Sequence, residues 1–157
     1  MTDSTVRRDT ASRRIQASPA AVYAAFVTPE AVAQWLPPDG ATMQIQVFEP
    51  RAGGRFRMTL TFASAPGKST SNTDVVVGCF VELVPQQRIV QAFEFDSPDP
   101  AFAGTMTMRW DLEAVSGDTV VTVVAENVPP GISHADHEVG MNSSLAHLAT
   151  YVESQIQ

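Results

Sequence analysis

The sequence has little of several features that would place the protein outside the cytoplasm. It has a single cysteine, Cys79, which cannot form an intramolecular disulfide, so nothing in it argues for secretion. No stretch approaches the ~20 apolar residues of a membrane-spanning helix. The arginines near the N-terminus are not followed by an apolar block, as they would be in a signal peptide. These absences predict a cytoplasmic protein without a membrane span.

Basic residues are also scarce. The net charge is −7, and four of the ten basic residues, Arg7, Arg8, Arg13 and Arg14, lie within the first fourteen positions. The rest of the chain is therefore acidic enough to repel a phosphate backbone, which argues against nucleic-acid binding. We interpret the arginine-rich start as a loose leader over residues 1–7 and a solvated first strand, with a basic patch as the alternative.

Motifs for catalysis and cofactor binding are missing as well. The sequence has no nucleophile elbow, phosphate-binding loop, dinucleotide fingerprint, CxxC pair or HExxH spacing. A metal site at His134 and His137 is the nearest alternative, but the adjacent Asp136 and Glu138 also suit the positive end of a helix. We therefore predict no catalytic residue, no metal and no cofactor, and we interpret His137 as structural.

The sequence does contain a well-ordered succession of helix and strand patterns. Ser18-Pro19 and Thr28-Pro29 are two helix-start signals within eleven residues, and Pro37-Pro38 ends the second helix. Further on, hydrophobic residues alternate with polar ones, as they do in half-buried strands. The pattern predicts strands at 8–16, 42–47, 55–62, 73–84, 88–95, 105–115 and 119–127, short helices starting at 19 and spanning 30–35, and a long helix at 133–153.

This order predicts an α+β fold of one domain, residues 1–157. A curved antiparallel sheet of six or seven strands packs around the long C-terminal helix. Met141, Leu145, Leu148 and Val152 form one helical stripe facing the sheet. The two short helices close one end of this cup, and Trp35 is expected near its rim. Such a cup keeps a cavity unless large side chains fill it.

Four stretches carry a family resemblance: RRIQASPAAVYAAFVTPEAVAQWLPP at 13–38, FEPRAGGRFRM at 48–58, GCFVELVPQQRIVQAFEF at 78–95 and HEVGMNSSLAHLATYV at 137–152. In this order they resemble the START-like, Bet v 1-like (SRPBCC) superfamily, in the branch named for activators of the heat-shock ATPase chaperone (AHSA-like). The resemblance implies a helix-grip fold with a cavity between sheet and helix. It implies no single activity, because this fold serves lipid carriers, hormone receptors, cyclases and chaperone-assisting domains.

Two positions depart from the family pattern. Family members often carry two adjacent aromatic residues where this chain has Trp35-Leu36, and a tryptophan where it has Met141. Both differences remove ring volume near the expected cavity. We therefore expect a roomier or more adaptable pocket, since methionine is flexible and polarizable.

The candidate ligand-binding residues are hydrophobic residues that are expected to face the cavity from the strands, the long helix and the rim. Pockets for small organic ligands are lined in this way. The set comprises Trp35, Phe56, Met58, Phe80, Phe93, Phe95, Met106, Met108, Trp110, Met141 and Leu145. The side on which Phe80 lies stays open, because residues 75–84 are apolar on both faces; Cys79, in the same run, is expected in the core. The alternative is that the whole set is simply core.

Charged residues within the strands are expected to point outward and to pair across the sheet. They are Arg57, Glu94, Arg109, Asp111 and Glu126. If Glu94 or Glu126 pointed inward instead, burial would raise its pKa and make it an acid–base candidate.

The leading functional hypothesis is a binding module that holds a hydrophobic small molecule. It acts as a monomer or a homodimer, since exposed strand edges invite self-association. The first alternative is a cyclase- or aromatase-like enzyme using the same cavity, which needs an inward-facing polar pair. The second, implied by the resemblance, is a chaperone-ATPase-assisting domain, although eukaryotic proteins of that type carry an additional N-terminal domain that this sequence does not show.

Overall fold

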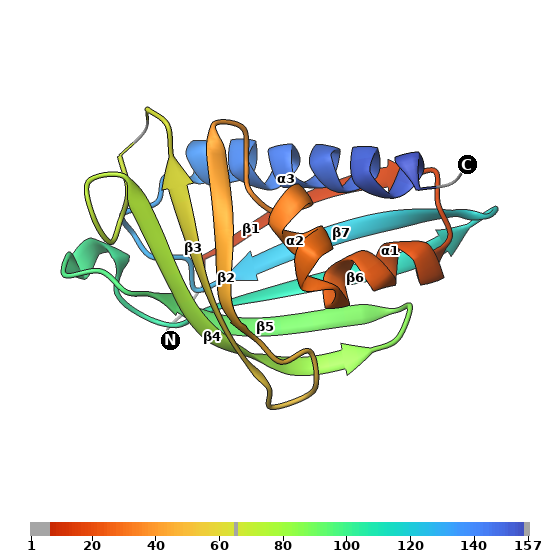
Figure 1. Cartoon of the computed structure of the whole chain (residues 1–157), viewed down its shortest axis with the longest axis horizontal. Coiled ribbons are helices and arrows are strands. Elements are labelled where there is room, and N and C mark those ends of the chain that lie inside the picture. Colours follow the sequence, from red (N-terminus) through yellow and green to blue (C-terminus); the bar gives the residue numbers. More distant parts are fainter. Residues whose placement is uncertain (1–6, 65, 156–157) are drawn as a thin grey trace, which may run out of the picture.

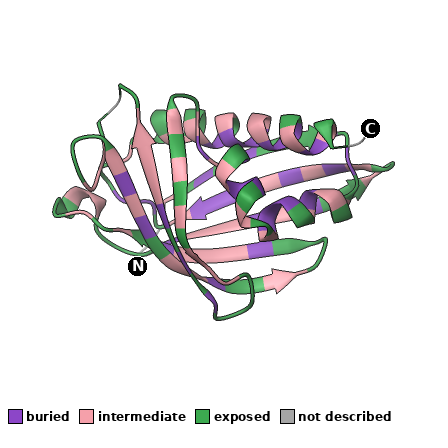
Figure 2. Ribbon diagram, viewed as in Figure 1, coloured by how far each residue is buried: buried purple, intermediate pink, exposed green. Residues whose placement is uncertain are grey.

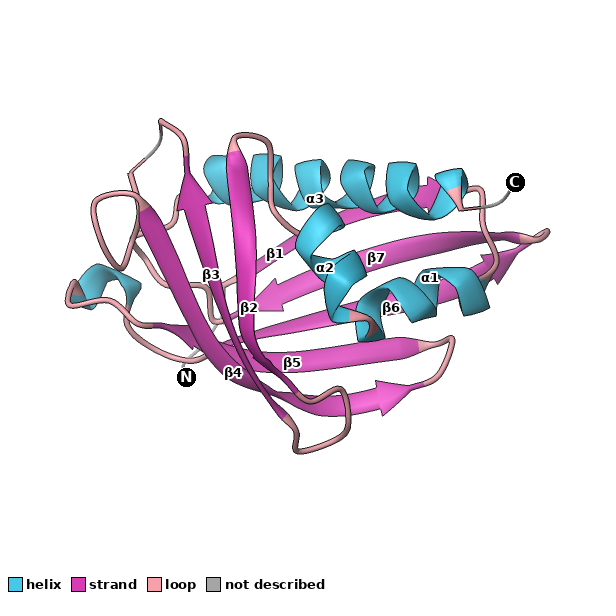
Figure 3. Ribbon diagram, viewed as in Figure 1, coloured by secondary structure: helices cyan, strands magenta, loops and turns pink. Residues whose placement is uncertain are grey.

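Seven strands of the described chain form one antiparallel sheet that wraps around a long helix (Figures 1 and 3). The computed structural model describes residues 7–64 and 66–155. Along the chain, the elements are β1 (Arg8–Ile15), α1 (Pro19–Val27), α2 (Pro29–Trp35), β2 (Ala41–Phe48), β3 (Arg55–Phe62), β4 (Thr73–Val84), β5 (Arg88–Phe95), η1 (Pro100–Phe102), β6 (Met106–Val115), β7 (Asp118–Glu126) and α3 (His134–Ser154). The predicted α+β helix-grip fold is confirmed.

The order of strands explains the cup shape. Neighbours in the sheet run β1-β7-β6-β5-β4-β3-β2, so β2 to β7 follow one another and β1 joins the far edge beside β7. The register shifts between Ile45 and Val47 in β2, and between Phe80 and Glu82 in β4. Bulges of this kind bend the strands that contain them. Figure 1 accordingly shows β2, β3 and β4 rising around the N-terminal half of α3.

The helix α3 lies across the concave face of the sheet with one side buried. The predicted stripe of Met141, Leu145, Leu148 and Val152 is buried. Figure 2 shows buried residues where the helices and the sheet face one another. The described helices, α3 included, lack the combination of length and hydropathy needed to cross a membrane.

The two short helices close one end of the cup, as predicted. Pro19 occupies the first turn of α1, and the Ser18 hydroxyl accepts a hydrogen bond from the backbone N–H of Ala21 at 3.2 Å. The Thr28 hydroxyl donates to the carbonyl of Ala24 at 2.7 Å and so holds the last turn of α1.

Trp35 lies inside the molecule, so its predicted position near the rim is wrong. It is 1% exposed, and its indole Nε1 donates to the carbonyl of Ala25 at 2.9 Å. Its ring meets Phe26 and Trp110 edge-on, with centroids 4.8 and 5.6 Å away. The turn between α1 and α2 directs this ring toward the sheet, and the local sequence does not determine that direction.

The charged strand residues lie on the outer face, as predicted. They are exposed or half-buried: Arg57, Glu94, Arg109, Asp111 and Glu126. Glu126 in β7 pairs with Arg8 in β1 at 2.5 Å, and Asp111 in β6 pairs with Arg88 in β5 at 2.8 Å. Neither glutamate among them points inward, so neither is the acid–base group that the sequence left open.

Two smaller expectations are corrected. Cys79 is half-buried rather than part of the core. Its neighbour Phe80 is fully buried, and successive side chains of a strand point to opposite faces. Residues 1–6 of the expected leader lie outside the described residues, but Arg7 is held firmly: its Nη1 donates to the carbonyl of Ile132 at 2.5 Å.

Candidate ligand-binding cavity

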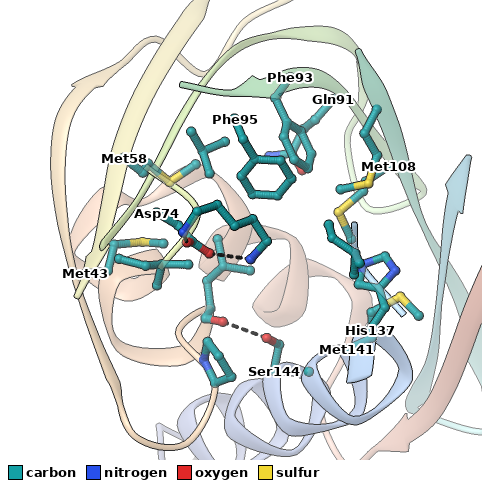
Figure 4. A pocket seen from close by; sticks show the side chains of 18 of the residues that line it. Met43, Met58, Asp74, Gln91, Phe93, Phe95, Met108, His137, Met141 and Ser144 are labelled. Atoms are coloured by element: carbon teal, nitrogen blue, oxygen red, sulfur yellow. Dashed lines mark hydrogen bonds and ion pairs between the residues drawn. The ribbon is translucent and has the colours of Figure 1, made fainter. Parts of the chain in front are cut away.

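A cavity of about 310 Å³ lies between the sheet and the N-terminal half of α3 (Figure 4). Most of its wall is apolar and comes from Leu36, Pro38, Met43, Phe56, Met58, Leu60, Phe62, Val76, Phe93, Phe95, Met106, Met108, Trp110, Ile132 and Met141. The polar residues of the wall are Lys68, Asp74, Gln91, Asp136, His137 and Ser144. Pockets for small organic molecules combine an apolar wall with a few polar groups in this way.

Eight of the eleven residues predicted to bind a ligand line this cavity. They are Phe56, Met58, Phe93, Phe95, Met106, Met108, Trp110 and Met141. The other three, Trp35, Phe80 and Leu145, lie outside the wall and are at most 1% exposed. Trp35 packs on Trp110 and Phe80 on Phe56, with centroids 5.6 and 5.3 Å apart, so both support the wall from behind. Ligand binding by any member of the set stays a prediction.

Several wall residues were missed although the sequence carries their signal. Met43 alternates with polar neighbours along β2, and Leu60 and Phe62 continue the alternation of Phe56 and Met58 along β3. Side chains two apart on a strand share a face. Extending the predicted face by these three positions would have found them.

Methionine dominates the wall to an unusual degree. Five of the six methionines in the sequence line the cavity, and the sixth, Met1, lies outside the described residues. Methionine has three rotatable bonds and a polarizable sulfur, so a methionine-rich wall adapts its shape to different contents. Met141, where family members often carry tryptophan, lies in this wall. The expectation of a more adaptable pocket requires this position.

Gly140 leaves further room in the wall. It lies in the middle of α3, where glycine is destabilising by up to about 1 kcal/mol relative to alanine. A Cβ added at this position would meet no heavy atom of the described chain within 4 Å. Close packing therefore does not require the glycine, but the open space beside it adds to the hollow.

A buried ion pair holds the loop between β3 and β4 over the cavity. Asp74 is 2% exposed and accepts hydrogen bonds from both the backbone N–H and the Nζ of Lys68, each at 2.6 Å. The same Nζ lies 4.9 Å from the ring centroid of Phe95, within the range of a cation–π contact. The positive charge of Lys68 is thus compensated from two sides.

A second buried carboxylate, Asp9, gathers three donors behind the wall, next to His137. Asp9 is completely buried in β1. Its oxygens lie 2.9 Å from Nη2 of Arg7, 2.9 Å from Nδ1 of His134 and 2.7 Å from Nδ1 of His137. Only the last of these donors also lines the cavity. The two histidines thus turn to Asp9, and no group of three or more metal-ligating side chains occurs among the described residues.

Burial and hydrogen bonding set the protonation of this cluster. Burial alone would raise the pKa of Asp9, but hydrogen bonds from Arg7, His137 and His134 outweigh it and hold the pKa far below its ordinary value. Burial lowers the pKa of His137 despite the attraction of Asp9. At neutral pH, Asp9 is therefore a carboxylate and His137 a neutral imidazole. Sequence reasoning missed Asp9, although it shares a strand face with the apolar Ala11 and Ile15.

Comparisons with known proteins agree with this fold. The profile of the family described as "Activator of Hsp90 ATPase homolog 1-like protein" matches residues 16–153. A crystal structure of a protein from Chromobacterium violaceum has 30% sequence identity and a TM-score of 0.84, covering 93% of this chain and 96% of that chain. No curated protein matches the chain.

More distant structures share the fold alone. A protein from Rhodobacter sphaeroides has 21% identity and a TM-score of 0.78, with 96% of this chain and 98% of that chain covered. An AHSA1-like protein from Aeromonas hydrophila has 17% identity and a TM-score of 0.72, with 95% and 94% covered.

Proposed function

This chain belongs to the activator of Hsp90 ATPase homolog 1-like family, and from that premise we propose that it binds an apolar small molecule between its sheet and α3. The observation that carries the proposal is the cavity of about 310 Å³ with its predominantly apolar wall. Folded proteins usually fill such a space with side chains, because a void forfeits dispersion contacts.

Two features of the wall favour an occupant over an accidental void. Gly140 lowers the stability of α3 without any packing reason, and an alanine or a larger residue would fit there. The five methionines supply surface that can adjust to a ligand, as they do at adaptable binding sites. A cavity kept open at the expense of stability is what a binding function requires.

The chaperone-assisting alternative rests on the family description alone. No surface feature described above points to a chaperone, whereas the cavity points directly to a small molecule. The enzymatic alternative has one feature in its favour, the pair formed by the buried Asp9 and the wall residue His137.

The test is a titration of the methyl-labelled methionine spectrum with 2-methylnaphthalene, an uncharged probe without donors or acceptors. Since five of the six methionines line the cavity, their methyl resonances report where the probe binds. Saturable shifts of these resonances support the proposal. Absence of saturable shifts up to the solubility limit of the probe would overturn it.

A pair of variants separates the cavity from the outer surface. Gly140→Leu places a side chain in the open space of the wall and is expected to weaken binding by about tenfold or more. Val139→Leu adds bulk to the neighbouring residue, which is 71% exposed, and should leave affinity unchanged. Equal affinities in both variants would place the probe outside the cavity. Native mass spectrometry of the purified protein would then identify the class of any natural occupant.

A further inference from the structure

We propose that the natural ligand is an uncharged, mostly apolar molecule bearing a hydroxyl group, and that Nε2 of His137 accepts the hydrogen bond of this hydroxyl. The inference rests on the proposed function and narrows the chemical class of the occupant. It follows from the direction of one imidazole ring and from the pairing of the other polar groups.

The first step concerns which nitrogen of His137 carries the proton. Nδ1 lies 2.7 Å from an oxygen of Asp9. Arg7 donates to both oxygens of Asp9 and helps to hold its pKa low, so Asp9 is ionised and can only accept, and Nδ1 of His137 must supply a hydrogen. A neutral imidazole carries only one proton, and burial keeps His137 neutral by lowering its pKa. Nε2 therefore presents a bare lone pair.

The second step concerns where this lone pair points. His137 lines the cavity, and Figure 4 shows its ring at the wall beside Met108 and Met141. Nε2 has no hydrogen-bond partner within residues 7–64 and 66–155, yet no buried side-chain nitrogen or oxygen in this part of the chain lacks one. The atom is therefore accessible, and because His137 lines the cavity, we infer that the cavity is the space that Nε2 meets. An acceptor at an apolar wall selects a donor, because a ligand without one leaves it unpaired.

The third step concerns charge. An anionic ligand would need a free cation, but Lys68 is already bonded to Asp74 at 2.6 Å. Gln91 accepts from the indole of Trp110 at 3.1 Å, and Ser144 donates to a backbone carbonyl at 2.6 Å. Lys68 and Ser144 are thus engaged within the protein, whereas Nε2 of His137 is not. Only the amide oxygen of Gln91 is used in its bond, and the carboxylate of Asp136 at the wall adds a charge that repels an anion. The wall therefore suits a neutral hydroxyl better than a carboxylate.

The experiment uses four naphthalene probes of similar size, followed through the labelled methionine methyl groups. 2-Naphthol donates a hydrogen bond, 2-methoxynaphthalene only accepts one, 2-methylnaphthalene does neither, and 2-naphthoate is an anion. We expect 2-naphthol to bind about tenfold more tightly than the methyl and methoxy probes, as one hydrogen bond to an otherwise unpaired acceptor at an apolar wall allows. The naphthoate should bind most weakly.

Two variants that each lose one hydrogen bond to Asp9 test whether His137 is the residue that recognises the hydroxyl. His137→Phe and His134→Phe each remove one hydrogen bond to Asp9, but only the first alters the cavity wall. His137→Phe should abolish the preference, so that 2-naphthol binds no more tightly than 2-methylnaphthalene. His134→Phe should keep the preference. If His137→Phe fails to fold, the comparison of the four probes on the wild-type protein still tests whether the cavity prefers a hydrogen-bond donor.

Each result has a distinct meaning. Equal binding of 2-naphthol, 2-methoxynaphthalene and 2-methylnaphthalene would overturn the inference and leave the binding function standing. Tightest binding of 2-naphthoate would also overturn it, in favour of an anionic ligand. A 2-naphthol preference that survives His137→Phe would place the acceptor elsewhere. Failure of all four probes to shift the cavity methionines would remove the proposed function itself.

Discussion

The two ends of the space under the helices are filled in opposite ways. At the end closed by α1 and α2, the rings of Phe26, Trp35 and Trp110 meet edge-on at centroid distances of 4.8, 5.2 and 5.6 Å. The indole of Trp35 has its own hydrogen-bond partner in the carbonyl of Ala25. The three rings of this end are therefore closely packed against one another.

The other end lies under the first half of α3 and is hollow. Its wall contains five methionines, Gly140 and the buried Asp74–Lys68 pair. The rings of Phe56, Phe93 and Phe95 also line it, and their centroids lie 6.1 to 6.3 Å apart. Trp110 belongs to both ends, since one side packs on Phe26 and Trp35 while the other lines the cavity. From this comparison we expect stability to be concentrated at the packed end, which leaves the other end free for binding.

The largest expected effect tests the packed end. Trp35→Ala removes a fully buried ring and should lower the free energy of unfolding by about 3–5 kcal/mol, measured by urea denaturation. Met108→Ala, at the hollow end, should cost only about 1 kcal/mol, because the half-buried side chain already lacks neighbours on its cavity side. Losses of similar size would show that the two ends are packed alike and would end the comparison.

A smaller effect is expected at the buried carboxylate of the hollow end. Asp9→Asn keeps the shape but loses the charge that binds Arg7 and two histidines, at a cost of about 2–3 kcal/mol. The matched control is Asp39→Asn, since Asp39 also lies 2.7 Å from a histidine of α3, His147, but its side chain is 88% exposed. That variant should lose less than about 0.5 kcal/mol. A large loss of unfolding free energy in Asp39→Asn would mean that burial of the carboxylate does not determine the size of the effect.

The hollow end should also make stability depend on pH. Because burial lowers the pKa of His137 below its ordinary 6.5, the unfolded chain takes up this proton before the folded protein does. The contribution of neutral His137 to the free energy of unfolding is therefore fully present above pH 6.5 and is lost as the pH falls through the folded-state pKa. Asp9 and Asp111, whose pKa values are also lowered, add a second decline that begins near pH 3.8.

The upper part of this decline can be assigned to one residue. His137→Phe should flatten the free energy of unfolding just below pH 6.5, as followed by urea denaturation at a series of pH values. It should reduce the lower decline without removing it, because Asp9 loses one of its three donors. Trp35→Phe, at the packed end, should lower the whole curve without changing its slope. An unchanged slope in His137→Phe would show that the folded and unfolded chains hold this proton equally well.

Local pattern was enough to predict most of the fold. The observed bounds of β4 and β5 coincide with the predicted strands 73–84 and 88–95, because residues of turns flank two clearly apolar runs. Period-two alternation also placed Phe56 and Met58 on the cavity wall, since a strand has only two faces. A short helix has more freedom, and the pattern of α2 did not reveal that Trp35 points inward.

The polar part of the site could not be found in this way. Asp9 and His137 lie 128 positions apart and meet only because β1 joins the sheet edge beside β7 and α3 crosses over it. Likewise, the pairing of Lys68 with Asp74 depends on the path of a loop that has no periodic pattern. Such contacts are properties of the assembled fold, so a single sequence shows the candidate side chains without their partners.

The smallest expected effect concerns Gly140 and the origin of the hollow. Gly140→Ala should raise the free energy of unfolding by about 0.5–1 kcal/mol, equivalent to about 1–4 °C in Tm, because alanine favours the helix and meets open space. Gly131→Ala is the opposite control, since its Cβ would lie 2.6 Å from Cε1 of Phe102 and should destabilise the protein. If Gly140→Ala were destabilising instead, the space beside α3 would already be filled in solution. A stabilised variant with weaker probe binding would show that this end of the molecule is kept open against its own stability.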